Sequence, residues 1–145
     1  MRRAFTELRW PAVLAATFVY FVLGVPWFSP GTLGPLWEQS LGFTRPQGWE
    51  PGPIMYLGPI IASFTASLAT ALLARATRAV TARDGAILGV VIALGYSVGV
   101  AGMDAISPSH PAPLTLFLIT GSYHLVGLVV VGVIVTVWRK PQTTP

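Results

Sequence analysis

The sequence predicts an all-α fold: a bundle of four transmembrane helices with both termini in the cytoplasm and a short interfacial helix after the first span. Three observations predict it. Hydrophobic residues make up 53% of the 145-residue chain and charged residues only 10%, against about 25% charged residues in soluble domains. The apolar residues fall into four runs of membrane-spanning length. The basic residues collect on alternate connections between these runs, as the positive-inside rule requires.

The four predicted spans cover residues 11–28, 54–74, 85–106 and 114–138 within a single transmembrane domain, residues 1–145. A helix needs about 20 residues to cross a hydrocarbon core of roughly 30 Å. Each run must be helical because lipid offers the backbone no hydrogen-bond partners. The first run ends in LGVPWFSP, without a small-x-small cleavage site, so we expect an uncleaved span and not a signal peptide.

Charged and tryptophan residues both predict the orientation. Eight of the nine basic residues fall on one side of the predicted membrane: Arg2, Arg3, Arg9, Arg75, Arg78, Arg83, Arg139 and Lys140. The other side carries only Arg45, accompanied by Glu38 and Glu50. The tryptophans mark an inner interface at Trp10 and Trp138 and an outer one at Trp27, Trp37 and Trp49. The clusters of basic residues therefore indicate topology, and we expect no nucleic acid as a partner.

The outer loop, residues 29–53, is the only long connection and begins with an apolar segment rich in Pro and Gly. Pro26 and Pro30 are expected to end the first helix. Segment 31–42 is expected to form a short amphipathic helix on the membrane surface, ending near Ser40 and Gly42. It is either an anchor that sets the depth of the first span or a lid over the outer mouth of the bundle, above Asp104. The predicted interfacial turn consists of Trp27, Phe28, Ser29, Pro30 and Trp37.

Small residues predict how the helices pack, because close approach replaces the hydrophobic drive between helices in lipid. The second span presents Ala62, Ser63, Ala66, Ser67, Thr70 and Ala71 on one face. The third span contains two small-xxx-small units, Gly85 with Gly89 and Gly95 with Gly99. We therefore expect the second and third spans to pack tightly together. Pro59 is expected to kink the second span near its outer end.

His124 and Tyr123 are the first candidates for a ligand contact or proton relay. Ten residues at 1.5 Å each separate Leu114 from His124, which places the imidazole about 15 Å deep, near the membrane midplane. An ionisable group at that depth usually faces the bundle interior or a water-filled cavity. The alternative is a neutral imidazole that hydrogen-bonds across helices to one of Tyr20, Tyr96 and Ser97. No second His or carboxylate lies at that level, so we expect no metal.

Asp104 and Tyr96, both in the third span, complete the candidate ligand or relay residues. Asp104 lies about 9 Å from the level of His124 along the membrane normal, which makes a direct ion pair between them doubtful. His110, in the turn SPSHPAP that follows, is the more plausible partner of Asp104. Hydration at the interface, or bonding to backbone donors of that turn, is the structural alternative. No residue is assigned a catalytic role, and no cofactor is expected.

Two stretches resemble one protein family. The first, GVPWFSPGTLGPLWEQSLGF, contains Gly24, Trp27, Phe28, Ser29, Pro30, Gly34, Trp37 and Gly42. The second, LFLITGSYHLVGLVVVGVIVTVW, contains Tyr123, His124, Leu125, Gly132 and Trp138. Both resemble the signature of the bacterial membrane proteins grouped as domain-of-unknown-function family 1761, with Thr120 where that family has an Asn. The resemblance implies four transmembrane helices and a bacterial cytoplasmic membrane, and it supplies no activity.

Three function classes remain open. The first is a non-enzymatic structural or accessory membrane subunit that packs in a homo-oligomer or a larger membrane complex, with the lipid bilayer and other membrane subunits as partners. The second is a carrier or channel for a small solute or ion, working as an oligomer with His124 at the midplane. The third is a membrane-embedded enzyme acting on lipid or quinone. Soluble-enzyme motifs such as HExxH, GxSxG and the phosphate-binding loop are missing, which favours the first class.

Overall fold

The computed structural model describes residues 8–138, and within them the secondary structure is helical, with no strand. The helices are α2 (Trp10–Phe28), α3 (Gly34–Leu41), α4 (Ile54–Ala76), α5 (Ala82–Ile92), η1 (Ala93–Ser97), α6 (Val98–Ala105) and α7 (Pro113–Val137). Because η1 is a turn of π-helix that joins α5 to α6, these three elements form one span. The four predicted spans are thus present as helices long and apolar enough to cross a membrane.

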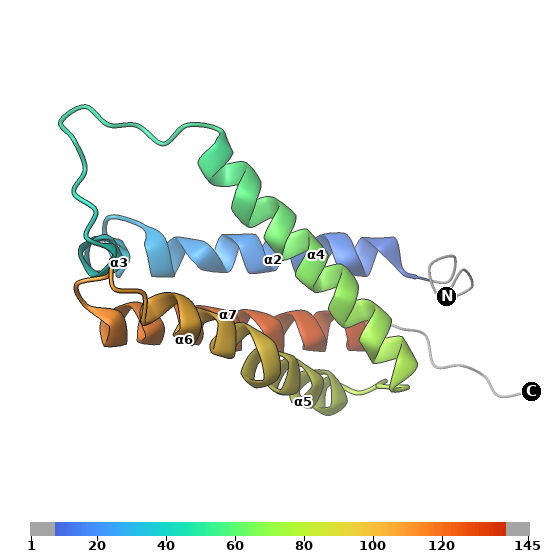
Figure 1. Ribbon diagram of the computed structural model, residues 1–145. Coiled ribbons are helices and arrows are strands. Elements are labelled where there is room, and N and C mark those ends of the chain that lie inside the picture. Colours follow the sequence, from blue (N-terminus) through green and yellow to red (C-terminus); the bar gives the residue numbers. More distant parts are fainter. Residues whose placement is uncertain (1–7, 139–145) are drawn as a thin grey trace, which may run out of the picture.

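The bundle is built around α7, which contacts every other helix of the described chain. In Figure 1, α2 lies alongside α7, α5 and α6 cover another side of α7, and α4 crosses α2 diagonally. The start of α2 and the end of α7 lie at the same end of the bundle, where Nη1 of Arg9 donates to the carbonyl of Trp138 at 3.0 Å. The short helix α3 lies at the opposite end (Figure 1). We call the α3 end the outer end and the other the inner end, after the orientation that the charges predict.

The observed helix bounds lie within three residues of the predicted ones. The largest difference is at the start of the third span, which begins at Ala82 where residue 85 was expected. A capping box causes this: Thr81 accepts from the amide of Asp84, and the Asp84 carboxylate accepts from the amide of Thr81. The basic residues Arg2, Arg3, Arg139 and Lys140, on which part of the predicted orientation depends, lie outside the described residues.

Pro26 does not end the first helix, so that prediction is wrong. α2 continues through Pro26 to Phe28, and the amide of Ser29 still donates to the carbonyl of Val25 at 3.0 Å. A proline two residues before the end of a helix removes one hydrogen bond without breaking the last turn. The chain leaves the helix at Ser29, whose backbone is extended. The expected short helix forms at Gly34–Leu41 and ends at Gly42, which adopts the left-handed conformation.

The expected tight packing of the second span on the third is also wrong. α5 packs chiefly on α7, while α4 packs on α2 and α7 and has only a small contact with α5. The backbones of α5 and α7 come so close that a methyl group on Gly85 would lie 2.3 Å from the carbonyl oxygen of Gly132. A methyl group on Gly89 would lie 2.3 Å from that of Leu128. α5 therefore packs on α7, because Gly85 of α5 and Gly132 of α7 let the two backbones come close.

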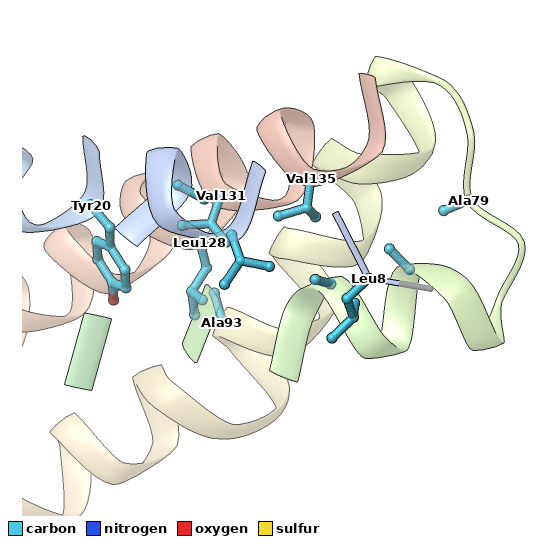
Figure 2. Close-up of a cluster of buried hydrophobic side chains, with 11 residues drawn as sticks. Leu8, Tyr20, Ala79, Ala93, Leu128, Val131 and Val135 are labelled. Carbon is cyan, nitrogen blue, oxygen red and sulfur yellow. The ribbon is translucent and has the colours of Figure 1, made fainter. Parts of the chain in front are cut away.

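The apolar core lies in the inner half of the bundle (Figure 2). Leu128, Val131 and Val135 of α7 point toward α2 and α4, and Ala93 of η1 packs beside Leu128. The fully buried members from α4 are small, Ala71 and Ala74, and the larger Phe64, Leu68 and Leu72 pack against the core while partly buried. The core therefore holds the helices together toward the end of the bundle where α2 begins and α7 ends.

Candidate functional site

Tyr20 and His124 meet at the middle of the bundle. His124 is the twelfth residue of the 25-residue helix α7, so the helix places it close to the middle of the span. Its Nδ1 lies 2.7 Å from the hydroxyl oxygen of Tyr20 on α2. Of the three expected partners of His124, the structure thus brings in Tyr20. Tyr96 is 71% exposed on the surface of η1, and Ser97 makes no hydrogen bond to the imidazole.

Tyr123 joins the same group from the neighbouring position on α7. Its hydroxyl donates to the backbone carbonyl of Tyr20 at 3.1 Å, and the hydroxyl of Ser63 on α4 lies beside it. The Tyr123 ring is 5.1 Å from that of Tyr20 and 5.2 Å from the imidazole of His124, centroid to centroid. Three spans thus contribute to one polar and aromatic cluster at mid-depth, which we call the midplane cluster: Tyr20, Ser63, Tyr123 and His124.

Gly127 makes the midplane cluster possible, and inspection of the sequence missed it. A methyl group at this position would lie 2.1 Å from Cε2 and 2.4 Å from Cδ2 of Tyr20. The Tyr20 ring therefore lies directly on the backbone of α7, one helical turn inward of Tyr123, and is only 4% exposed. The signal available in the sequence was the i, i+4 spacing of Tyr123 and Gly127, which places an aromatic ring and a gap on one helix face.

The predicted interfacial turn is continuous with the midplane cluster. The Trp27 indole donates from Nε1 to the hydroxyl of Ser122 at 3.0 Å, and its ring is 6.1 Å from that of Tyr123. Phe28 contacts both Tyr123, at 5.1 Å, and Trp37 of α3, at 5.0 Å. A row of aromatic side chains thus runs along α2 and α7 from mid-depth to the outer end. The two motifs that stood far apart in the sequence form one aromatic assembly.

Close backbone contacts position α3 at the outer end of this row. The amide of Gly34 donates to the carbonyl of Ser29 at 3.1 Å, and a methyl group on Gly34 would lie 2.4 Å from that oxygen. At the other end of α3, Gly42 lies against the Pro111 ring of the turn between α6 and α7. Pro30, which follows Ser29, is exposed and makes no side-chain contact of this kind. The segment after the first span is therefore attached to the bundle at both ends.

The rest of the outer loop contains its own polar contact. Arg45 donates from Nε to the Glu38 carboxylate at 2.7 Å, and its guanidinium lies 5.1 Å from the centre of the Trp49 ring. Hydrogen bonding to Glu38 raises the pKa of Arg45. Arg45, the one Lys or Arg that the described residues place at this end of the bundle, is thus paired with a carboxylate within the loop.

Asp104 lies apart from the midplane cluster. Its carboxylate is 3.8 Å from Nε2 of His110, the partner expected from the sequence. The Asp104 side chain is 68% exposed, whereas that of His110 is 14% exposed. The structure therefore separates the four candidate residues into three places: Tyr123 and His124 in the midplane cluster, Asp104 in the outer turn and Tyr96 on the surface of η1.

Tyr96 lies between Gly95 and Gly99, against which no other part of the described chain packs. A methyl group on Gly95 or on Gly99 would meet no atom within 4 Å. The contacts of Gly85 with Gly132 and of Gly89 with Leu128 put Ala93 level with His124, one turn further along both helices. The π-helical turn η1 therefore starts at the depth of the midplane cluster. Among residues 8–138, no group of three or more His, Cys, Asp or Glu side chains gathers into a possible metal site.

Comparison with known proteins gives one match. The sequence model of a family described as "Protein of unknown function (DUF1761)" matches residues 11–136. The chain belongs to the DUF1761 family. That match covers nearly all of the four transmembrane helices, the whole first stretch that resembled the family and the second stretch as far as Thr136; Trp138 lies outside it. None of the curated proteins matches the chain, and none of the solved structures does. For this DUF1761 protein, function has to be inferred from the site itself.

Proposed function

We propose that this DUF1761 protein is a non-enzymatic membrane subunit that packs laterally against another transmembrane chain, in the first instance a second copy of itself. One observation carries the proposal: the third span has two Gly-xxx-Gly units, and the fold uses only one of them. The backbone of α7 packs closely against Gly85 and Gly89. Gly95 and Gly99 have the same spacing and meet no other part of the described chain.

Packing energetics support this use of Gly95 and Gly99. Helices in lipid associate through close van der Waals contact and not through apolar burial, so a smooth glycine face is the surface on which a second helix gains most. The exposed side chains around the two glycines are large and apolar and can interlock with a neighbour. They are Val91, Leu94, Tyr96, Val100 and Met103.

The test is the oligomeric state of glycine variants. The full chain is reconstituted in lipid nanodiscs, and the number of copies per disc is measured by native mass spectrometry. Gly95→Leu and Gly99→Leu, which fill the open face, are expected to convert an oligomer to single chains. Gly58→Leu is the matched control, since Gly58 is an exposed helical glycine of α4 with nothing within 4 Å. Single chains in the unmodified protein, or dissociation by Gly58→Leu alone, would overturn the proposal.

We also propose a bacterial cytoplasmic membrane location with both termini inside. The basic residues that the structure describes at the end where α2 begins and α7 ends support this: Arg9, Arg75, Arg78 and Arg83. Single cysteines in a chain that has none report the orientation directly. A cysteine at Thr77 is expected to resist a membrane-impermeant maleimide in intact cells, and one at Gly48 to react. The reverse pattern would contradict the orientation.

A carrier for a small solute or ion is the second candidate function, favoured by the pairing of Tyr20 with His124 at mid-depth. An imidazole bonded to a phenol is a plausible step for a proton crossing the bilayer. In proteoliposomes containing a pH-sensitive dye, His124→Ala is expected to abolish proton flux while the helical circular dichroism spectrum is preserved. Flux that the substitution leaves unchanged, or that the unmodified protein lacks, excludes this candidate.

A further inference from the structure

We infer that the midplane cluster binds a lipid-soluble ring that carries a carbonyl oxygen, a molecule of the quinone class, which reaches His124 from within the bilayer. This goes beyond the role of a membrane subunit and concerns a different face of the molecule. The inference depends on the exposure of the cluster, the hydrogen-bonding state of the imidazole and the chemistry available at that depth.

The cluster is uncovered on its outer side because α4 leaves the bundle there. Every residue from Ile54 to Ala62 is exposed, whichever way its side chain points, whereas Ser63 is 2% exposed. Contact between α4 and the other helices therefore begins at Ser63, beside Tyr123. Figure 1 shows the first turns of α4 standing away from α2. His124 and Tyr123 are each partly exposed.

The imidazole has one ring nitrogen without a partner. Within residues 8–138, the Tyr20 hydroxyl bonds only to Nδ1 of His124. The buried Tyr20 hydroxyl must donate its proton in a hydrogen bond, and Nδ1 is its partner. Nδ1 is therefore the acceptor, and the proton of the neutral imidazole lies on Nε2. Nε2 makes no hydrogen bond in the described chain. An unpaired N–H in hydrocarbon costs several kcal/mol, so this position favours any molecule that supplies an acceptor.

Depth selects the class of acceptor. His124 lies about 16 Å from the start of α7 and about 20 Å from its end at 1.5 Å per residue, in the part of the bilayer that water and lipid headgroups do not reach. The ester carbonyls of phospholipids lie at the interface, so an acceptor at mid-depth belongs to a lipid-soluble molecule. The rings of Tyr20, Tyr123 and His124 lie within 5.1 to 6.4 Å of one another. Aromatic surfaces of this kind stack against a planar ring.

A second unsatisfied group lies on the same helix face as Ser63. The hydroxyl of Ser67, one turn further inward on α4, is fully buried and has no hydrogen-bond partner in the described chain. Ser and Thr in membrane helices usually bond back to the preceding turn, as Thr70 does to the carbonyl of Ala66 at 2.8 Å. Because Ser67 is fully buried, a molecule in the bilayer does not reach it from the surface, and the N–H of His124 is the donor on which the inference depends.

The experiment uses decylubiquinone as the probe and the full chain in nanodiscs. Binding is followed by quenching of the fluorescence of the five tryptophans, of which Trp27 contacts Tyr123 of the cluster. Saturable quenching is expected in the unmodified protein. His124→Phe keeps a ring but removes the donor, and it is expected to weaken binding by about five- to tenfold, as the loss of one hydrogen bond implies. Tyr20→Phe, which frees the imidazole proton to move to Nδ1, is expected to weaken binding as well.

Phe18→Leu is the matched control, because Phe18 is an exposed aromatic residue of α2, two residues from Tyr20 and outside both the cluster and the glycine face. It should bind decylubiquinone like the unmodified protein. Quenching that rises linearly with probe, equally in every variant, would mean simple partitioning into the bilayer and would overturn the inference. So would a His124→Phe variant that binds normally. A His124→Phe variant that loses its oligomeric state would instead show Nε2 facing another chain. The oligomer test of the glycine face at Gly95 and Gly99 is independent of this experiment, because its failure would change none of these outcomes.

Discussion

At the scale of single residues, the bundle depends on where side chains are absent as much as on where they are present. The Tyr20 ring fits only because residue 127 has no Cβ, and its hydroxyl then reaches His124 across two helices. The buried phenol of Tyr20 and one nitrogen of the partly buried imidazole of His124 satisfy each other by this hydrogen bond. The sequence located His124 at the midplane and named Tyr20 among its partners, but it did not show that Gly127 is required.

The Gly127→Ala variant tests that requirement. A methyl group 2.1 Å from Cε2 of Tyr20 must push the ring off α7, and the displacement breaks the bond to His124. Overpacking of this kind costs about 1–3 kcal/mol. The free energy of unfolding is measured in mixed detergent micelles by circular dichroism, and a loss in that range is expected. The control is Gly121→Ala, where the added methyl group would meet Phe117 at an ordinary 3.7 Å. Equal stability of the two variants would contradict the close fit.

At the scale of helices, the sequence predicted well which segments form helices and how long they are, but it predicted poorly which helices pack together. Hydropathy over some 20 residues is a local property, so the four spans could be located from composition alone. Partner choice depends on which backbone approaches which, and small residues occurred on the second, third and fourth spans alike. The sequence also did not predict that the outer half of α4 stands away from the other helices, because its residues are as apolar as those that pack. Pro59 lies in that exposed half, where a missing hydrogen bond disturbs no helix–helix contact.

Packing of α5 on α7 should be sensitive to one methyl group. Gly85→Ala puts the methyl 2.3 Å from a backbone carbonyl of α7, and backbone cannot move aside as a side chain can. We expect a loss of about 2 kcal/mol in the free energy of unfolding. Gly58→Ala, at a helical glycine of α4 with open space around it and outside the glycine face, should change this value by less than about 0.5 kcal/mol. Thermal unfolding followed by circular dichroism compares the pair, and a larger loss in Gly58→Ala would contradict the assignment of packed and open glycines.

The turn between α4 and α5 contains a strained residue outside the membrane core. Arg78 has φ of 56°, and the amide of Ala79 that follows donates to the carbonyl of Ala74 at 2.9 Å, as in a Schellman C-cap. A side chain in this conformation costs about 1 kcal/mol relative to glycine. Arg78→Gly is therefore expected to stabilise the protein by about 1 kcal/mol. Arg78→Ala removes the same charge without relieving the strain, so a gain of equal size in that variant would contradict this explanation.

At the scale of the whole molecule, two faces are left unused by the fold. One is the outward glycine face of Gly95 and Gly99, where we propose that a second chain packs. The other is the uncovered side of the midplane cluster, where we infer that a lipid-soluble ring binds. The number and length of the spans follow from the lengths of the apolar runs, which are readable from the sequence. These two faces follow from the positions of close contacts, which required the structure.

The central claim is that Gly95 and Gly99 face a second copy of the chain, and disulfide cross-linking tests it most directly. The protein contains no cysteine, so a single Gly99→Cys substitution gives an unambiguous reporter. In native membranes treated with a lipid-soluble oxidant, this variant is expected to form a species of twice the 15.4 kDa chain mass. Leu118→Cys, on an exposed position of α7, should remain a single chain. A Gly99→Cys protein that stays monomeric, or cross-links no more than Leu118→Cys, would contradict the account.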